Sequence, residues 1–242
     1  MTAPLFLPTD APPDVLLAVS ERGSAPPKTE SPTEYLARRF AADLGVPGIP
    51  IVRATQMHGS RVVVVEESPG ASETVDAGRC DAIVTRLPGI ALVVQTADCV
   101  PVLLASDRAI GAVHAGWRGA DAGVVGAAAD AFLGLTGETR SVRAWLGPSI
   151  GACCYEVGAE VATRFSAEFT RQSRAGKSFL DLAAVVRRQL EEAAIPAENV
   201  SPPGVCTMCG GERYASYRRD REKAGRMIAL IARSPYAGVR SA

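Results

Sequence analysis

Three side chains with metal-binding or nucleophilic chemistry stand beside apolar segments of strand length. The chain contains two histidines, His58 and His114, and Cys99 lies between them. Two imidazoles and a thiolate are the ligand set of a catalytic zinc site, which keeps a fourth position for water or substrate. The intervals are too wide for a compact zinc finger, so these ligands could meet only through the tertiary fold. The alternative is that each side chain is packed and hydrogen-bonded at a strand end.

Asp98 directly precedes the cysteine and is open to three interpretations. It could orient a ligand from the second shell of the site, accept a proton, or bond a nearby backbone amide in a turn. Gln56 and Thr96 are similar, because each could donate a hydrogen bond in a pocket or stabilise a turn. Asp98 is therefore a candidate catalytic residue beside Cys99, and Gln56 is a candidate substrate-binding residue.

Two glycine-rich loops are candidate anion sites. The loop 116–119 stands between an expected strand and an expected helix, where free backbone amides and the helix dipole favour an anion. Arg118 in this loop could help to hold phosphate. The loop 147–151, with Ser149, is interpreted in the same way. Tight strand-to-helix turns also need glycine for steric reasons alone, so the pattern by itself is weak evidence.

Two consecutive arginines near the C-terminal end, Arg218 and Arg219, lie in a segment expected to be extended, 213–219. Successive side chains of a strand point to opposite faces, so at most one of the two guanidiniums can face the site. Surface ion pairing explains the other. Arg218 is the candidate substrate-binding residue.

The apolar pattern predicts the elements that must position these groups. Segments 90–95, 100–104 and 110–113 are short continuous apolar runs, typical of strands buried on both faces. Further strands are expected over 15–20, 61–67, 81–85, 142–146 and 227–231, and helices over 32–44, 121–135, 157–169 and 178–194. Residues 1–13 are expected to be a loose tail and 68–79 a variable loop. Strands and helices without strict alternation argue for an α+β fold.

Composition limits the class of protein. The 242 residues are expected to form one domain, 1–242, and 47% hydrophobic with 21% charged residues is ordinary for a soluble globular chain. Basic and acidic residues number 26 each, which gives no general attraction to nucleic acid or anionic membranes. No secretion signal or apolar segment of membrane-spanning length stands out, so we expect a cytoplasmic protein without an evident obligate protein partner.

Six cysteines without a secretion signal predict reduced thiols rather than disulfides. Cys153 and Cys154 are adjacent, and Cys206 and Cys209 form a single CxxC pair. One such pair is poor evidence for a zinc ribbon. A redox pair or a second metal site is possible, but two structural thiols near a strand are the favoured interpretation.

Five motifs in order, QMHGSRV, TADCVPVLL, VHAGWRG, LGPSIGACCYEVG and SYRRD…GRMIALI, together resemble the YfiH-type laccase-domain family. Its members were first described as copper-dependent polyphenol oxidases and are now assigned as purine nucleoside phosphorylases. The resemblance covers about residues 53–231. It implies a layered sandwich, with two mixed sheets packed face to face and helices outside, and it favours His58, Cys99 and His114 as metal ligands.

The same resemblance implies an enzyme that holds Zn²⁺, with Cu²⁺ as the alternative, and that acts on adenosine, inosine and methylthioadenosine with phosphate. Adenosine deamination is a further activity attributed to the family. The usual nucleobase deaminase signature, His-x-Glu with Pro-Cys-x-x-Cys, is absent from this chain, so deamination would need a different geometry.

Three rival functions stay open. A copper polyphenol oxidase fits the His/Cys/His ligands, although multicopper chemistry needs more than two imidazoles. A metal-free hydrolase would use Cys99 as nucleophile and His114 as base, since the wider fold resembles that of bacterial toxins with such a dyad. A non-catalytic nucleoside-binding protein is the third rival, because the family's N-terminal pocket motifs are reduced here to Arg22-Gly23.

Overall fold

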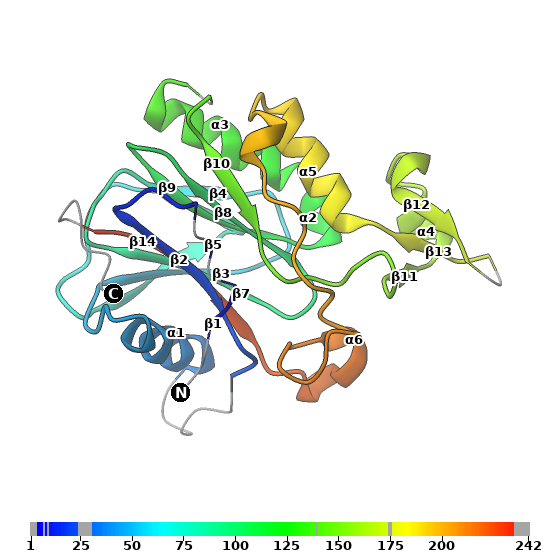
Figure 1. Cartoon of the computed structure of the whole chain (residues 1–242), viewed down its shortest axis with the longest axis horizontal. Coiled ribbons are helices and arrows are strands. Elements are labelled where there is room, and N and C mark those ends of the chain that lie inside the picture. Colours follow the sequence, from blue (N-terminus) through cyan, green and yellow to red (C-terminus); the bar gives the residue numbers. More distant parts are fainter. Residues whose placement is uncertain are drawn as a thin grey trace.

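Two β-sheets packed face to face form the centre of the computed structural model (Figure 1). The structure describes residues 4–6, 8, 10–23, 31–138, 140–173 and 176–234. Across the first sheet the strands are β1 (Pro4–Phe6), β2 (Val15–Ser20), β14 (Met227–Arg233), β7 (Ala91–Thr96), β3 (Ile51–Thr55) and β5 (Thr74–Arg79). Across the second they are β10 (Arg143–Leu146), β8 (Val100–Ala105), β9 (Ile110–Ala115), β6 (Ala82–Thr85) and β4 (Val62–Val65).

Helices cover the outer faces of both sheets (Figure 1). Helix α1 (Pro32–Asp43) packs on the first sheet, and α3 (Val124–Thr136) and α5 (Leu182–Glu192) pack on the second. The remaining helices are short: α2 (Trp117–Asp121), α4 (Ala159–Ala162) and α6 (Tyr217–Asp220). The chain also has 3₁₀ turns at 167–169, 197–199 and 221–223. A small third sheet has the order β11 (Glu156–Val157), β13 (Ser178–Leu180) and β12 (Thr170–Gln172). The predicted α+β sandwich with helices outside is confirmed.

Alternation along the strands explains the layers. In β7, Leu92 and Val94 belong to the core between the sheets, whereas Val93 packs towards α1. In β8, Leu103 faces the other sheet and Leu104 faces α3. Both faces of β7 and of β8 are therefore buried, which accounts for their continuous apolar runs in the sequence. Within the described residues, no helix combines the length and apolarity needed to span a bilayer.

Several expected elements differ in the structure. The predicted helix 157–169 is wrong: it is divided among β11, α4 and a 3₁₀ turn, and β12 follows. The predicted helix 178–194 begins only at residue 182, because the Asp181 carboxylate caps it by accepting from the Ala184 amide at 2.9 Å. The predicted helix 121–135 corresponds to α3, which begins at residue 124. The expected loop 116–119 instead runs into a separate short helix, α2, which Gly123 with φ of 82° divides from α3.

The structure also differs from the predictions at both edges of the first sheet and in the segment 213–219. The expected loose tail contains β1, which pairs with β2, although residues 1–3, 7 and 9 lie outside the described part. The expected loop 68–79 contains β5, parallel to β3. The segment 213–219 is not extended, because it contains a turn and then α6, where the Ser216 hydroxyl caps the helix.

Candidate metal and anion site

Strand register brings three functional groups to one end of the second sheet. In the antiparallel pair β8–β9, Val100 lies opposite Ala115 and Pro101 opposite His114, so Cys99 is next to the imidazole. Strand β6 pairs with β9 on its other side, with Ala82 opposite Val113, so Asp81 also lies there. These groups are far apart in the sequence. They meet because β6 and β8 begin, and β9 ends, at the same end of the sheet.

The second histidine reaches this edge on the loop between β3 and β4. His58 has a φ of 58°, and the Asp81 carboxylate accepts hydrogen bonds from the amides of Met57, His58 and Gly59 at 3.1, 2.9 and 2.7 Å. The same carboxylate accepts from His114 Nδ1 at 2.9 Å. One buried carboxylate thus positions both imidazoles.

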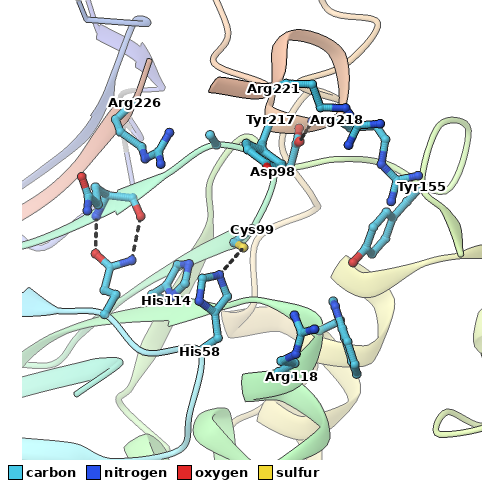
Figure 2. Close-up of a pocket in the computed structure, with 14 residues that line it drawn as sticks. His58, Asp98, Cys99, His114, Arg118, Tyr155, Tyr217, Arg218, Arg221 and Arg226 are labelled. Atoms are coloured by element: carbon cyan, nitrogen blue, oxygen red, sulfur yellow. Dashed lines mark hydrogen bonds between the residues drawn. The ribbon is translucent and has the colours of Figure 1, made fainter. Parts of the chain in front are cut away.

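The three potential ligand atoms converge tightly (Figure 2). One ligand atom each from His58, Cys99 and His114 lies within 4.8 Å of the others, and His58 Nε2 is 3.8 Å from Cys99 Sγ. The two rings meet edge-on, with centroids 4.8 Å apart. A Cβ at Gly116 would lie 2.8 Å from the His58 ring and 3.0 Å from Cys99 Sγ, so only glycine leaves room.

This geometry fits a metal ion. Hydrogen bonding of His114 Nδ1 to a carboxylate fixes the ring and leaves Nε2 as the ligand, the usual arrangement behind a metal-bound histidine. The His58, Cys99 and His114 group could therefore hold a metal with one position open.

Charges within the group reinforce one another. Burial disfavours a thiolate, but the neighbouring His114 outweighs it and lowers the pKa of Cys99 to about 6. Burial also disfavours the imidazolium, yet Cys99 and Asp81 raise the pKa of His114 to about 9. Burial alone would raise the pKa of Asp81. The hydrogen bonds donated by His114 and the backbone amides outweigh it, so the pKa of Asp81 lies below its usual value. Near neutral pH the metal-free group is a thiolate beside an imidazolium.

A cavity of about 490 Å³ opens onto the group (Figure 2). Its lining includes four guanidiniums, those of Arg118, Arg218, Arg221 and Arg226. Within the described parts of the chain, no carboxylate oxygen lies within 4.0 Å of any of these guanidinium nitrogens. Arg218 and Arg226 donate to the backbone carbonyls of Glu156 and Gly225, which leaves their charge uncompensated by any described carboxylate. Concentrated positive charge in a concave site favours an anionic ligand.

Comparison with known proteins identifies the family of this chain. The family described as multi-copper polyphenol oxidoreductase laccase matches residues 32–234. The chain belongs to this laccase-domain family.

Two curated relatives carry the name purine nucleoside phosphorylase. The protein of Xylella fastidiosa is 36% identical over 200 residues, covering 79% of this chain and 75% of the relative. That of Mycobacterium bovis is 38% identical over 198 residues, covering 80% and 76%. The crystal structure of the hypothetical protein YfiH from Bacillus licheniformis superposes with a TM-score of 0.81 at 25% identity, covering 94% of this chain and 99% of that one.

Within this laccase-domain protein, several proposed substrate residues already have structural partners. The Gln56 amide is paired with the Gln95 backbone in both directions at 2.8 Å, so it holds the β3 end against β7. Asp98, with φ of 89°, accepts from the Thr207 hydroxyl and the Arg218 amide, each at 2.6 Å. These contacts favour a positioning role for Asp98 over proton transfer.

Of the remaining candidate residues, some line the pocket and others only hold the surrounding backbone in place. Arg118 stacks on Trp117 with 4.3 Å to the ring centroid, and Arg218 lies 5.2 Å from the Tyr155 ring centroid, both at the pocket. Arg219 is absent from the pocket lining and donates to backbone carbonyls of 207–214. Both arginines lie in helix α6, so the predicted strand alternation is not what separates them. Ser149 is buried outside the described pocket lining, in a bridge with Cys206.

Sequence reasoning missed Asp81, Arg221 and Arg226. Asp81 was assigned only to the start of a strand, although it precedes a fully apolar run, where a buried carboxylate needs a partner. Arg221 and Arg226 carried no recognisable signal, because their approach to the pocket depends on the turn after α6.

Proposed function

We propose that this protein is an enzyme that cleaves purine nucleosides with phosphate, releasing the base and ribose 1-phosphate. The observation that carries the proposal is the set of four arginines without described carboxylate partners beside the His58, Cys99 and His114 group. The names of its curated relatives support the same reaction class. Adenosine, inosine and methylthioadenosine are the proposed substrates, and Zn²⁺ is the proposed metal.

In this reaction a phosphate oxygen attacks C1′ of the sugar while the bond from C1′ to the base nitrogen breaks. The electron pair of that bond leaves with the base, which takes up a proton. Arg118 and Arg218 would hold the phosphate dianion in line for the attack, which lowers the entropic barrier. Burial raises the pKa of Tyr155, so its hydroxyl stays protonated and can donate a hydrogen bond to the sugar or base.

A metal bound at His58, Cys99 and His114 would supply Lewis-acid stabilisation of negative charge. Asp81 would hold the imidazoles in their ligand orientation. Asp98 would fix the backbone of Arg218 and thereby the pocket wall. Deamination of adenosine would use the same site with water in place of phosphate, and it belongs to the proposal as a secondary activity.

The test is base release from inosine, adenosine and methylthioadenosine, monitored by chromatography with and without phosphate. We expect hypoxanthine and adenine to appear only when phosphate is present, and inosine to appear from adenosine if deamination also occurs. Base release independent of phosphate would overturn phosphorolysis in favour of hydrolysis. No base release from any of the three nucleosides in metal-loaded protein would favour a nucleoside-binding protein.

Arg118→Gln tests the anion site separately. Removing a hydrogen bond to a charged group costs about 1.5–3 kcal/mol, so we expect KM for phosphate to rise roughly 10- to 100-fold. Arg188→Gln is the control, because Arg188 is a half-exposed arginine of α5 that pairs with Glu168. Equal KM values in the two variants would contradict the assignment of Arg118.

A metal-free cysteine hydrolase is the second candidate, favoured by the lowered pKa of Cys99 beside His114. If activity survives chelation but not alkylation of Cys99, this alternative replaces the metal enzyme. The copper oxidase is weaker, because both histidines of the whole chain already belong to one site. Stoichiometric zinc without copper in protein prepared from unsupplemented medium would exclude it.

A further inference from the structure

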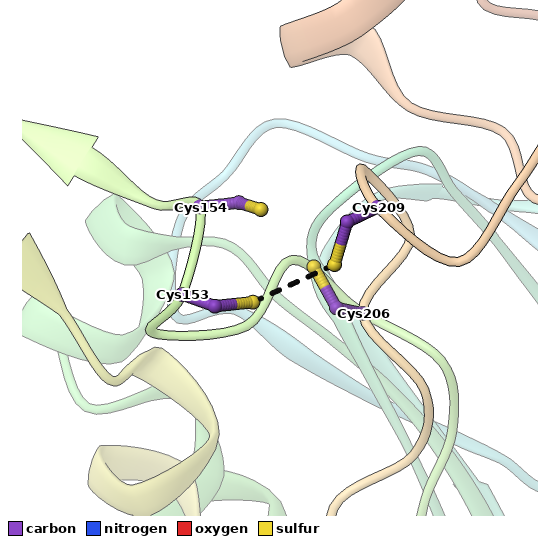
Figure 3. Close-up of side chains that lie close together, drawn as sticks. All are labelled: Cys153, Cys154, Cys206 and Cys209. Atoms are coloured by element: carbon purple, nitrogen blue, oxygen red, sulfur yellow. Dashed lines mark hydrogen bonds between the residues drawn. The ribbon is translucent and has the colours of Figure 1, made fainter.

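Four cysteines from two distant loops meet outside the site described above (Figure 3). Cys153 and Cys154 lie in the turn before β11, and Cys206 and Cys209 lie in the loop before α6. Their sulfurs all lie within 4.8 Å of one another, and Cys153 Sγ is 3.7 Å from Cys209 Sγ. All four are free thiols.

These distances fit a single tetrahedral ion. A Zn–S bond of about 2.3 Å places the sulfurs of a four-cysteine site about 3.8 Å apart. A disulfide would bring two sulfurs to about 2.05 Å. A cluster of several irons spreads its thiolates more widely, because each one binds a different iron. The observed spacing therefore lies closest to that of one metal ion.

The backbone around the CxxC pair is built independently of any ion. The Gly151 amide donates to Cys206 Sγ at 3.2 Å, and the Gly210 amide donates to the Cys206 carbonyl at 2.8 Å. A Cβ at Gly210 would lie 2.5 Å from that carbonyl oxygen, so the turn requires glycine. Arg219 donates to the carbonyls of Thr207 and Met208, the two residues between the cysteines, at 3.1 and 3.2 Å. These contacts pre-form a chelating turn.

We propose that Cys153, Cys154, Cys206 and Cys209 bind one structural metal ion, with Zn²⁺ as the best fit to four thiolates at this spacing. The site shares no ligand with the His58, Cys99 and His114 group. It stands whether or not the protein is a phosphorylase. A closed four-thiolate site leaves no position for substrate, so its role is structural.

The ion would tie together two walls of the pocket. Tyr155 follows Cys154 directly, and Arg218 lies in α6, the helix that follows the loop of Cys209. Thr207, inside the CxxC turn, donates to Asp98 at 2.6 Å. Metal at the four cysteines would therefore fix the loops that carry the aromatic and cationic groups of the pocket.

Cobalt substitution of the wild-type protein tests the proposal without any variant. Absorption from thiolate-to-cobalt charge transfer grows with the number of thiolates, and the two sites hold four and one. Full-length protein loaded with two equivalents of Co²⁺ should show roughly five times the band of a single-thiolate site, with tetrahedral visible bands. A band no larger than that of one thiolate would overturn the proposal.

Variants assign the ion to the cluster. Cys206→Ser with Cys209→Ser should lower the zinc content, measured by elemental mass spectrometry, by one ion per chain and the cobalt band to roughly one-fifth. His114→Ala should lose the other ion and keep the four-thiolate band. Cys80→Ala is the matched control, since Cys80 is a free cysteine outside both groups, and its metal content should equal the wild type.

Two further results would overturn the proposal. One is equal zinc content in wild type and the double serine variant. The other is peptide mapping of protein purified without reductant that shows a Cys153–Cys209 disulfide in zinc-saturated samples, which would identify a redox pair instead. A double variant that fails to fold leaves the wild-type cobalt spectrum as the deciding measurement.

Discussion

At the scale of single residues, Asp81 connects both histidines through one buried carboxylate. Partners behind metal-bound histidines typically contribute about 10- to 100-fold in metal affinity. We therefore expect Asp81→Asn to weaken zinc binding by about that factor, measured by competition with a coloured chelator. Asp76→Asn is the control, because Asp76 is a strand carboxylate that pairs with Arg53. Equal affinity in Asp81→Asn and wild type would contradict the positioning role.

The charge state of Cys99 gives a pH prediction for the metal-free protein. The thiolate reacts with iodoacetamide, and His114 lowers the pKa of Cys99 to about 6, so alkylation should rise with pH through a midpoint near 6. His114→Ala should move that midpoint upward. Cys80 is an internal control, because burial raises its pKa to about 11 and should keep it unlabelled at neutral pH. A Cys99 midpoint near 9, read by peptide mass spectrometry, would refute the ion pair.

Residue types alone pointed to part of the site. His58, Cys99 and His114 could be singled out because the chain has only two histidines and Cys99 lies between them beside an apolar run, and the family motifs then favoured all three as metal ligands. Asp81 could not be recognised, because its partner His114 comes from another strand and the pairing depends on register. Gln56 was predicted to contact substrate. It lines the pocket and exchanges one donated and one accepted hydrogen bond with the Gln95 backbone, so its contact with substrate stays a prediction.

At the scale of elements, the turn from β9 into α2 decides whether the site can form. We expect Gly116→Ala to fold but to lose metal binding and activity, since its Cβ would meet the His58 ring at 2.8 Å and Cys99 Sγ at 3.0 Å. Gly126→Ala is the matched control in α3, with nothing within 4 Å of the added Cβ. The control should gain about 0.5–1 kcal/mol in unfolding free energy by chemical denaturation and keep its metal. Unchanged metal affinity in Gly116→Ala would contradict the crowded geometry.

Elements with both faces buried were predictable, and peripheral ones were not. Strands β2, β7, β8 and β9 follow their apolar runs within one or two residues. The helix expected over 157–169 is interrupted because Val157 belongs to β11, which pairs with β13, and only Ala159–Ala162 and a 3₁₀ turn at 167–169 are helical. Edge strand β5 was missed because its sequence is half-exposed and partly polar, and it contains no continuous apolar run that would indicate a strand.

At the scale of the whole molecule, the fold brings five separate segments to one pocket, around His58, Cys99, His114, Tyr155 and Arg218. The layered fold was predicted from the resemblance to the laccase-domain family. Local apolar patterns do not specify which faces of the two sheets pack together. The four-cysteine cluster was not predictable in the same way, because Cys153 and Cys154 lie about fifty positions before Cys206 and each pair alone is a weak signal. Tyr155 follows Cys154 directly and Arg218 lies in α6 beyond Cys209, so metal at the cluster would hold both of these parts of the pocket wall.

The central claim is that the arginine-lined pocket delivers phosphate to the sugar carbon of a purine nucleoside. The most direct measurement is phosphorus NMR of inosine and inorganic phosphate incubated with metal-loaded, full-length protein. The account predicts a growing ribose 1-phosphate resonance, one phosphate consumed for each hypoxanthine released, and none with Cys99→Ser. Hypoxanthine release with the inorganic phosphate signal unchanged would contradict it.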